Sequence, residues 1–214
     1  MNALILVDLQ NDFMPRGALA VAGGDEVVPI ANRVMPYFDL VIATQDWHPA
    51  NHLSFASQHD GHQVGDVVDL DGLPQMLWPD HCIEESTGAA MHVDLNSTAI
   101  ERVFRKGTDR QIDSYSGLFD NGHRKATGLG EFLRQRGVAE VYVLGLATDY
   151  CVKFTALDAA ELGFETTLVV DACRGVNLSP GDVDRAIEEL RAAGVQIATS
   201  EEITTRLSAA QRNE

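Results

Sequence analysis

The chain has 214 residues, of which 45% are hydrophobic, and 32 acidic against 16 basic residues give a formal net charge of −16. This composition suits a globular protein with a sizeable core. The acidic balance argues against nucleic acid and anionic membranes as partners, because both require basic patches. No linker-like tract or internal repeat interrupts the sequence, so we expect one domain over residues 1–214, as a monomer or a homo-oligomer.

The amino-terminal segment MNALILVDLQNDF does not resemble a signal peptide, since it has no basic start and reaches Asp8 too early. No apolar stretch approaches the roughly 20 residues that a membrane span needs. The cysteines Cys82, Cys151 and Cys173 are odd in number and widely spaced, which argues against a disulfide framework. We therefore expect a cytoplasmic protein.

Short apolar runs alternate with amphipathic stretches along the chain. The runs are short and rich in β-branched residues, which is typical of buried strands in a parallel sheet. They span residues 3–7, 40–44, 103–104, 141–144, 166–170 and 195–198. Helices are predicted over residues 25–38, 127–136, 151–162 and 180–193. The alternation predicts a three-layer α/β domain.

The segment from residue 46 to residue 99 breaks this alternation. It is rich in His, Asp, Pro and Gly and is too long for a simple connection. Loops of this size within a compact domain are usually functional or disordered. Trp47, Phe55, Trp78 and several histidines favour an ordered, functional insertion.

Chemically distinct side chains stand where the predicted strands end. Asp8 ends the first apolar run, Asp46 follows the second, Lys106 ends the third, and Cys151 opens the helix after the fourth. In open parallel sheets, sites form beyond the carboxyl ends of the strands. A thiol at a helix start ionises more readily than a free thiol, a carboxylate moves protons, and an ammonium stabilises anions. This pattern predicts a catalytic site with Cys151 as nucleophile, Asp8 as base and Lys106 as its charge partner. A Cys151 thiol that only packs in the core is the alternative.

The motif DWHPANH suggests a metal site in the insertion. Asp46, His48 and His52 supply a carboxylate and two imidazoles, which suit zinc, manganese or iron rather than calcium. The candidates for a fourth ligand are His59, His62, His81 and His92. His81 is favoured because the neighbouring residues 78–79, Trp and Pro, would fix its loop. A loop that is simply rich in histidine is the alternative.

Several motifs together resemble those of nicotinamidases, which belong to the isochorismatase-like cysteine hydrolases. They are VDLQNDF, TQDWHPANHLSFASQH, LWPDHC, FRKGTD, DSYSGLFDN and GLATDYCV, in this order along nearly the whole chain. The combination of DWHPANH with ATDYCV makes the resemblance specific, since either motif alone would be weaker evidence. It implies a single α/β domain with a six-stranded, mainly parallel sheet flanked by helices, and a metal-binding insertion at about residues 46–99.

The resemblance also implies roles for individual residues. Cys151 would form a triad with Asp8 and Lys106. The backbone N–H groups of Ala147 and Cys151 would form the oxyanion hole, after a cis peptide bond between Leu146 and Ala147.

The remaining implied roles concern the substrate ring and the metal. Phe13, Trp78 and Tyr115 would enclose the aromatic ring, whereas Tyr150 receives no role. One divalent transition metal, zinc with iron or manganese as alternatives, would be held by Asp46, His48, His52 and His81.

The implied activity is hydrolysis of nicotinamide to nicotinate and ammonia through a cysteine thioester, in NAD salvage. Cys151 would attack the carboxamide, Asp8 would protonate the leaving ammonia and activate water, and the metal would bind the ring nitrogen. Three alternatives stay open at this point. They are a hydrolase that uses metal-bound hydroxide, a cysteine hydrolase acting on isochorismate or a carbamoyl compound, and a metal-binding module without catalysis.

Overall fold

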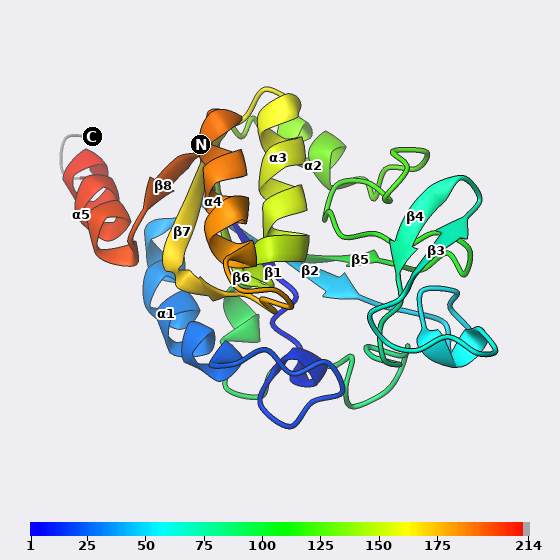
Figure 1. Cartoon of the computed structure of the whole chain (residues 1–214). Coiled ribbons are helices and arrows are strands. Elements are labelled where there is room, and N and C mark those ends of the chain that lie inside the picture. Colours follow the sequence, from blue (N-terminus) through cyan, green and yellow to red (C-terminus); the bar gives the residue numbers. More distant parts are fainter. Residues whose placement is uncertain (212–214) are drawn as a thin grey trace.

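A computed structural model of the chain describes residues 1–211. Six strands form one parallel sheet in the order β5-β2-β1-β6-β7-β8, which confirms the expected α/β class (Figure 1). Their bounds are β1 (Asn2–Val7), β2 (Leu40–Asp46), β5 (Arg102–Lys106), β6 (Glu140–Leu146), β7 (Glu165–Arg174) and β8 (Gln196–Ala198). Each of these strands contains or overlaps one of the apolar runs predicted from the sequence.

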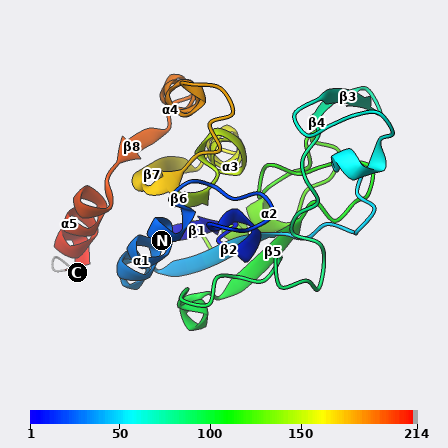
Figure 2. The same cartoon turned by 60° about the horizontal axis from the view of Figure 1, so that its bottom comes forward.

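Helices cover both faces of this sheet. The α-helices are α1 (Val27–Val34), α2 (Leu129–Gln135), α3 (Lys153–Glu161), α4 (Asp182–Ala192) and α5 (Ser200–Gln211). Figure 2 shows α3 and α4 on one face of the sheet and α1 and α5 on the other. Helix α2 lies beside the end of α3, where Arg134 Nη2 donates to the carbonyl of Leu162 at 3.2 Å. The sheet is therefore the middle layer of three. No helix within residues 1–211 is long and apolar enough to cross a membrane.

The helix predicted over residues 25–38 is divided into three pieces. Short 3-10 segments, Gly24–Glu26 and Met35–Tyr37, flank α1. Pro36 accounts for the second break, because it supplies no backbone N–H to continue the hydrogen bonds of the helix. Helix α4 begins at Asp182 rather than at residue 180, after a glycine in the left-handed conformation.

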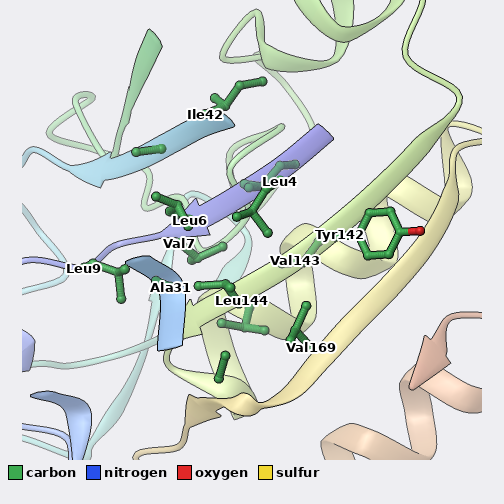
Figure 3. Packing of buried hydrophobic residues seen from close by; sticks show 14 of the residues in the cluster. Leu4, Leu6, Val7, Leu9, Ala31, Ile42, Tyr142, Val143, Leu144 and Val169 are labelled. Carbon is green, nitrogen blue, oxygen red and sulfur yellow. The ribbon is translucent and has the colours of Figure 1, made fainter. Parts of the chain in front are cut away.

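The hydrophobic core lies around the central strands β1 and β6 (Figure 3). Leu4 and Leu6 of β1 and Val143 and Leu144 of β6 are fully buried, and Ala31 of α1 packs among them. Burying a leucine or valine side chain stabilises a fold by about 1.5–3 kcal/mol relative to leaving it exposed. These strands therefore provide a rigid support for the residues that follow their carboxyl ends.

The order of the strands reverses between β1 and β6. After β1 the chain adds β2 and then β5 on one side, and it crosses to add β6, β7 and β8 on the other side. Ligands in open α/β sheets bind outside the carboxyl ends of the strands at such a switch point. Here the switch point places Asp8, which follows β1, close to the segment that follows β6.

The insertion between β2 and β5 lies on the right-hand side of Figure 1. It contains an antiparallel hairpin of β3 (Val67–Leu70) and β4 (Leu73–Met76), which was not predicted. Its later part is tied to the segment after β1, because Asn11 donates to the carbonyl of Ala90 at 3.0 Å and His92 donates to that of Leu9 at 2.8 Å. Residues of the insertion are thereby held beside the carboxyl ends of the strands.

Candidate active site

Lys106 joins the predicted catalytic residues into one buried cluster. Its Nζ atom lies 2.9 Å from Asp8 Oδ2, 2.5 Å from Asp46 Oδ1 and 3.3 Å from Cys151 Sγ. It also donates to the carbonyl of Ser114 at 2.9 Å. The side chains of all four predicted residues are buried, and Lys106 is only 2% exposed. The structure thus brings together residues that are up to 143 positions apart in the sequence, from 8 to 151.

Neighbouring strands set the positions of the charged members. Asp46 and Lys106 are register partners at the ends of β2 and β5. Asp8 follows β1 with a positive φ of 50°, and its Oδ1 accepts a hydrogen bond of 2.6 Å from Thr44 Oγ1 on β2. Adjacent parallel strands therefore deliver two carboxylates and an ammonium to one edge of the sheet.

Burial and the charge of Lys106 act in opposite directions on Asp8. Burial raises the pKa of the Asp8 carboxyl to about 6, although the Lys106 ammonium lowers it. For Lys106 itself, burial lowers the pKa, but Asp46 and Asp8 outweigh this effect and raise the pKa well above its usual value. At neutral pH the site therefore holds a charged lysine and an ionised Asp8 that can still accept a proton.

Cys151 lies in a π-helical turn, Thr148–Val152, that leads into α3. Burial raises the pKa of its thiol well above the usual value, and Lys106 opposes this increase only in part. A helix start alone suggested a thiol that ionises readily, so burial reverses the expected direction. One carboxylate oxygen each of Asp8 and Asp46 and the Cys151 sulfur all lie within 4.8 Å of one another. Carboxylates that could accept the thiol proton therefore lie next to Cys151.

The carboxyl end of β6 and the turn that follows it lead to Cys151. Gly145 has a φ of 130°, and a Cβ atom there would lie 2.1 Å from the carbonyl oxygen of Val7, so only glycine fits. The peptide bond between Leu146 and Ala147 is cis, as the resemblance implied. The carbonyl of Ala147 then accepts hydrogen bonds of 3.1 Å from the N–H groups of Tyr150 and Val152.

A pocket opens in front of Cys151. Phe13, Trp78 and Tyr115 line it, as expected for ring contacts, together with Ala147. Trp78 Nε1 donates to the Tyr115 hydroxyl at 3.1 Å, which links two of these walls. The pocket therefore combines aromatic walls with the Cys151 thiol at one end.

Other lining residues were not assigned a role from the sequence. Tyr150 lines the pocket, and its ring centroid lies 4.9 Å from that of Trp78. Leu19 and Val176 complete the apolar lining. Both are ordinary apolar residues in loops, so no local pattern distinguishes them in the sequence.

Asp46, His48 and His81 form the group best suited to a metal. One ligand atom from each lies within 4.8 Å of the others, and all three residues are buried. His81 Nδ1 contacts the carbonyl of Pro79 at 2.8 Å, which leaves its Nε2 lone pair 3.8 Å from Asp46 Oδ2. Burial lowers the pKa of His81 to about 4, so its imidazole is neutral. His48 Nδ1 is buried without a hydrogen-bond partner within residues 1–211. A carboxylate and two imidazoles fit a divalent transition metal.

His52 differs from the expectation that it completes this ligand set. Among the described residues it groups with His48 and Asp113, and not with Asp46 and His81. The chain turns after residue 48, since the N–H of His52 donates to the carbonyl of Pro49 at 2.9 Å. This turn carries the imidazole away from Asp46. The other candidate ligands, His59, His62 and His92, also lie outside the group of Asp46, His48 and His81.

Two further polar residues support the site and were not singled out from the sequence. The side-chain amide of Gln10 donates to the carbonyl of Asp46 and accepts from its N–H, both at 2.8 Å. Asp113 lies 3.2 Å from His48 Nε2. Burial raises the pKa of Asp113, but the hydrogen bond and charge of His48 outweigh it and lower the pKa below its usual value. Both residues occur inside the motifs VDLQNDF and DSYSGLFDN, and this position is the signal that could have pointed to them.

Comparison with known proteins identifies clear relatives. The isochorismatase domain family matches residues 2–202. The nicotinamidase of Escherichia coli (strain K12) is 53% identical over 202 residues, which cover 92% of this chain and 94% of that protein. The nicotinamidase/pyrazinamidase of Mycobacterium tuberculosis is 38% identical over 94% of this chain and 100% of that protein.

Solved structures agree with these relatives. The nicotinamidase structure from Acinetobacter baumanii superimposes with a TM-score of 0.92 at 44% identity, over 94% of this chain and 97% of that chain. The pyrazinamidase of Pyrococcus horikoshii, solved in complex with zinc, superimposes with a TM-score of 0.75 at 40% identity, over 92% and 98% of the two chains.

Proposed function

Because the chain belongs to the isochorismatase family, we propose that it is a nicotinamidase, an amidohydrolase that converts nicotinamide to nicotinate and ammonia in NAD salvage. The nicotinamidases that resemble it over nearly its full length support this assignment. The single observation that carries it is the contact of buried Lys106 with both Asp8 and Cys151. This cluster lies at the end of an aromatic pocket that also reaches Asp46 and His81.

In the proposed reaction, the aromatic walls hold the ring and present the carboxamide to Cys151. Sγ forms a bond to the amide carbon while the thiol proton passes to the Asp8 carboxylate. The N–H groups of Ala147 and Cys151 stabilise the oxyanion that results. The carbon–nitrogen bond then breaks, the proton on Asp8 passes to the nitrogen, and ammonia leaves a thioester.

The second half of the reaction releases nicotinate. Asp8 accepts a proton from water, whose oxygen attacks the thioester carbon, and the carbon–sulfur bond breaks. The departing Cys151 thiolate takes back a proton from Asp8, which restores the starting state. Lys106 stabilises the ionised forms of both residues, since its Nζ atom contacts both of them.

A divalent transition metal, zinc with iron or manganese as alternatives, would be held by Asp46, His48 and His81. The neutral His81 and the unpartnered Nδ1 of His48 support this choice, as does the zinc complex of the Pyrococcus horikoshii relative. When bound, the ion would supply a Lewis-acidic partner for the ring nitrogen. His52 is assigned no ligand role, because its imidazole lies outside this group.

The proposal also includes the domain organisation, the compartment and the partners of the enzyme. One domain with a metal-binding insertion acts on a small molecule in the cytoplasm, as a monomer or a homo-oligomer, without a nucleic acid or membrane partner. The net charge of −16 supports the last point, since nucleic acids and anionic membranes repel an acidic surface.

The test is to incubate the purified protein with nicotinamide and to quantify both ammonia and nicotinate. The wild-type protein should release them in equal amounts, and Cys151→Ala should release neither at a measurable rate. Cys173→Ala is the matched control, because Cys173 is also buried but does not line the pocket, and it should remain active. Residual turnover of Cys151→Ala within about tenfold of wild type would instead indicate metal-bound hydroxide as the nucleophile.

A further inference from the structure

Asp113 makes a buried, long-range contact that the reaction above does not use. Its Oδ1 atom lies 3.2 Å from Nε2 of His48, and the two side chains are 4% and 1% exposed. The residues are 65 positions apart, and Asp113 belongs to the loop after β5 whereas His48 follows β2. The contact therefore exists only because the fold brings two separate loops together.

The carboxylate of Asp113 is itself fixed by its surroundings. The backbone N–H of Ser114 donates to Oδ1 at 2.7 Å, and Gln75 Nε2 donates to Oδ2 at 3.4 Å. These two hydrogen bonds fix the orientation of the carboxylate independently of its contact with His48. A carboxylate that is held in this way can orient the group that donates to it.

The imidazole of His48 is enclosed on the side that faces Asp113. A Cβ atom at Gly107 would lie only 2.7 Å from His48 Nε2, so even one added carbon would collide with the ring. The backbone on both sides is held as well, because the N–H of His48 donates to the carbonyl of Cys82 at 3.0 Å and its carbonyl accepts from Glu84 at 2.8 Å. The ring therefore has little freedom to rotate.

The two nitrogens of His48 consequently differ. To bind a metal, the His48 imidazole must be neutral; in that form it carries one proton, and a carboxylate beside Nε2 keeps that proton on Nε2. The lone pair is then on Nδ1, the buried atom that has no hydrogen-bond partner within residues 1–211. A histidine that binds a metal through one nitrogen typically donates its other N–H to such a carboxylate.

We propose that Asp113 is a positioning residue that fixes the tautomer and the orientation of His48, so that Nδ1 is ready to bind the metal. This inference rests on the proposed metal site of Asp46, His48 and His81. It goes beyond that site by assigning the metal affinity in part to a residue that is not a ligand.

The experiment measures zinc affinity of the metal-free protein by competition with a chromophoric chelator. Asp113→Ala should weaken zinc binding about 10-fold to 100-fold. Asp120→Ala is the matched control, since Asp120 is a buried carboxylate of the same loop whose Oδ1 atom accepts the N–H groups of Gly122 and Arg124. We expect its zinc affinity to stay within about threefold of wild type, because it lies apart from the ligands.

A second readout concerns the proton and does not depend on how any Asp113 variant folds. In wild-type protein without metal, at a pH where the imidazole of His48 is neutral, ¹⁵N NMR should show it as the tautomer protonated on Nε2. In a folded Asp113→Ala protein, this preference should be reduced. A wild-type His48 protonated on Nδ1 would overturn the proposal.

The outcomes separate this inference from the proposed metal site. If wild-type protein binds no zinc, or if His48→Ala binds it normally, the metal site itself is wrong. If His48→Ala loses zinc binding while folded Asp113→Ala binds zinc with wild-type affinity, only the role of Asp113 is wrong.

Discussion

The Nζ atom of Lys106 lies 3.3 Å from the Sγ atom of Cys151, and both side chains are buried. The same ammonium contacts Asp8 and Asp46, so one positive charge lies in contact with a thiol and two carboxylates. Removing one partner of such a buried cluster leaves uncompensated charge in a dry environment. Replacing any one residue of the cluster should therefore disturb the charges of the others.

Lys106→Met should lower kcat/KM for nicotinamide by at least about 100-fold, because it removes the charge that stabilises Asp8 and the Cys151 thiolate. The measurement is steady-state turnover, with circular dichroism to verify the fold. Lys153→Met is the control, since that ammonium pairs with Glu189 outside the cluster. A folded Lys106→Met protein with normal turnover would contradict the role of the ammonium.

Asp8→Asn should lower kcat by roughly 10²-fold to 10⁴-fold, because an amide cannot exchange the proton that the reaction needs. Thr44→Val provides the comparison, since it removes the 2.6 Å hydrogen bond to Asp8 but keeps the carboxylate. Its loss of activity should be clearly smaller. A near-normal rate for folded Asp8→Asn would exclude Asp8 from the mechanism.

The activity should also depend on the ionisation of Asp8. Its pKa is about 6, and the carboxylate form is the one that accepts the thiol proton, so kcat/KM should fall as the pH decreases below about 6. The profile is obtained from initial rates between pH 5 and 8, a window set by that pKa. A constant kcat/KM down to pH 5 would show that Asp8 is not the titrating base.

The stability of the protein should depend on pH in the opposite direction to its activity, because of the same Asp8 carboxyl. Its pKa of about 6 exceeds the usual value of 3.8, so the folded protein binds this proton more tightly than the unfolded chain does. The contribution of Asp8 to the free energy of unfolding should therefore decrease as the pH rises through this window, by up to about 3 kcal/mol. Urea unfolding should show Asp8→Asn gaining stability relative to wild type between pH 4 and pH 7, the two sides of that window. No relative gain would contradict the raised pKa.

His81→Ala should lower the metal content of the purified protein and raise KM, because it removes one member of the ligand group. Elemental analysis after dialysis measures the metal bound per chain. His62→Ala is the control, since that exposed histidine pairs with Asp66 and lies outside the ligand group, and its metal content should be normal. Unchanged metal in folded His81→Ala, or full activity of metal-free wild type, would refute the assigned site.

Benzamide should be a poor substrate. It has the ring and the amide of nicotinamide, but a C–H group replaces the ring nitrogen. The contacts with Phe13 and Trp78 would be almost unchanged, whereas the polar end near Asp46 and His81 would lose its partner. We expect kcat/KM to fall at least about 100-fold, or about 2.7 kcal/mol. Equal kcat/KM values would disconnect the metal site from recognition of the ring, and His81→Ala should reduce the discrimination.

The sequence by itself determined the class of the fold and predicted the residues of the candidate site. The six strands were predictable because a buried parallel strand is a continuous apolar run, which is a local signal. Asp8, Lys106 and Cys151 were recognisable for a related reason, since each stands at or just after the end of such a run. The hairpin of β3 and β4 escaped prediction because its strands are short and partly exposed.

Only the tertiary structure decided which histidines lie together with Asp46. It also decided how burial changes the pKa values of the candidate catalytic groups. The sequence grouped His52 with Asp46 and His48 and favoured His81 as the fourth ligand, but a turn carries His52 toward Asp113, while His81 approaches Asp46. A helix start suggested a low pKa for the Cys151 thiol, yet burial raises it. Direction and desolvation depend on neighbours that are distant in the chain. A local pattern contains neither, because both arise only when the loops pack against the sheet.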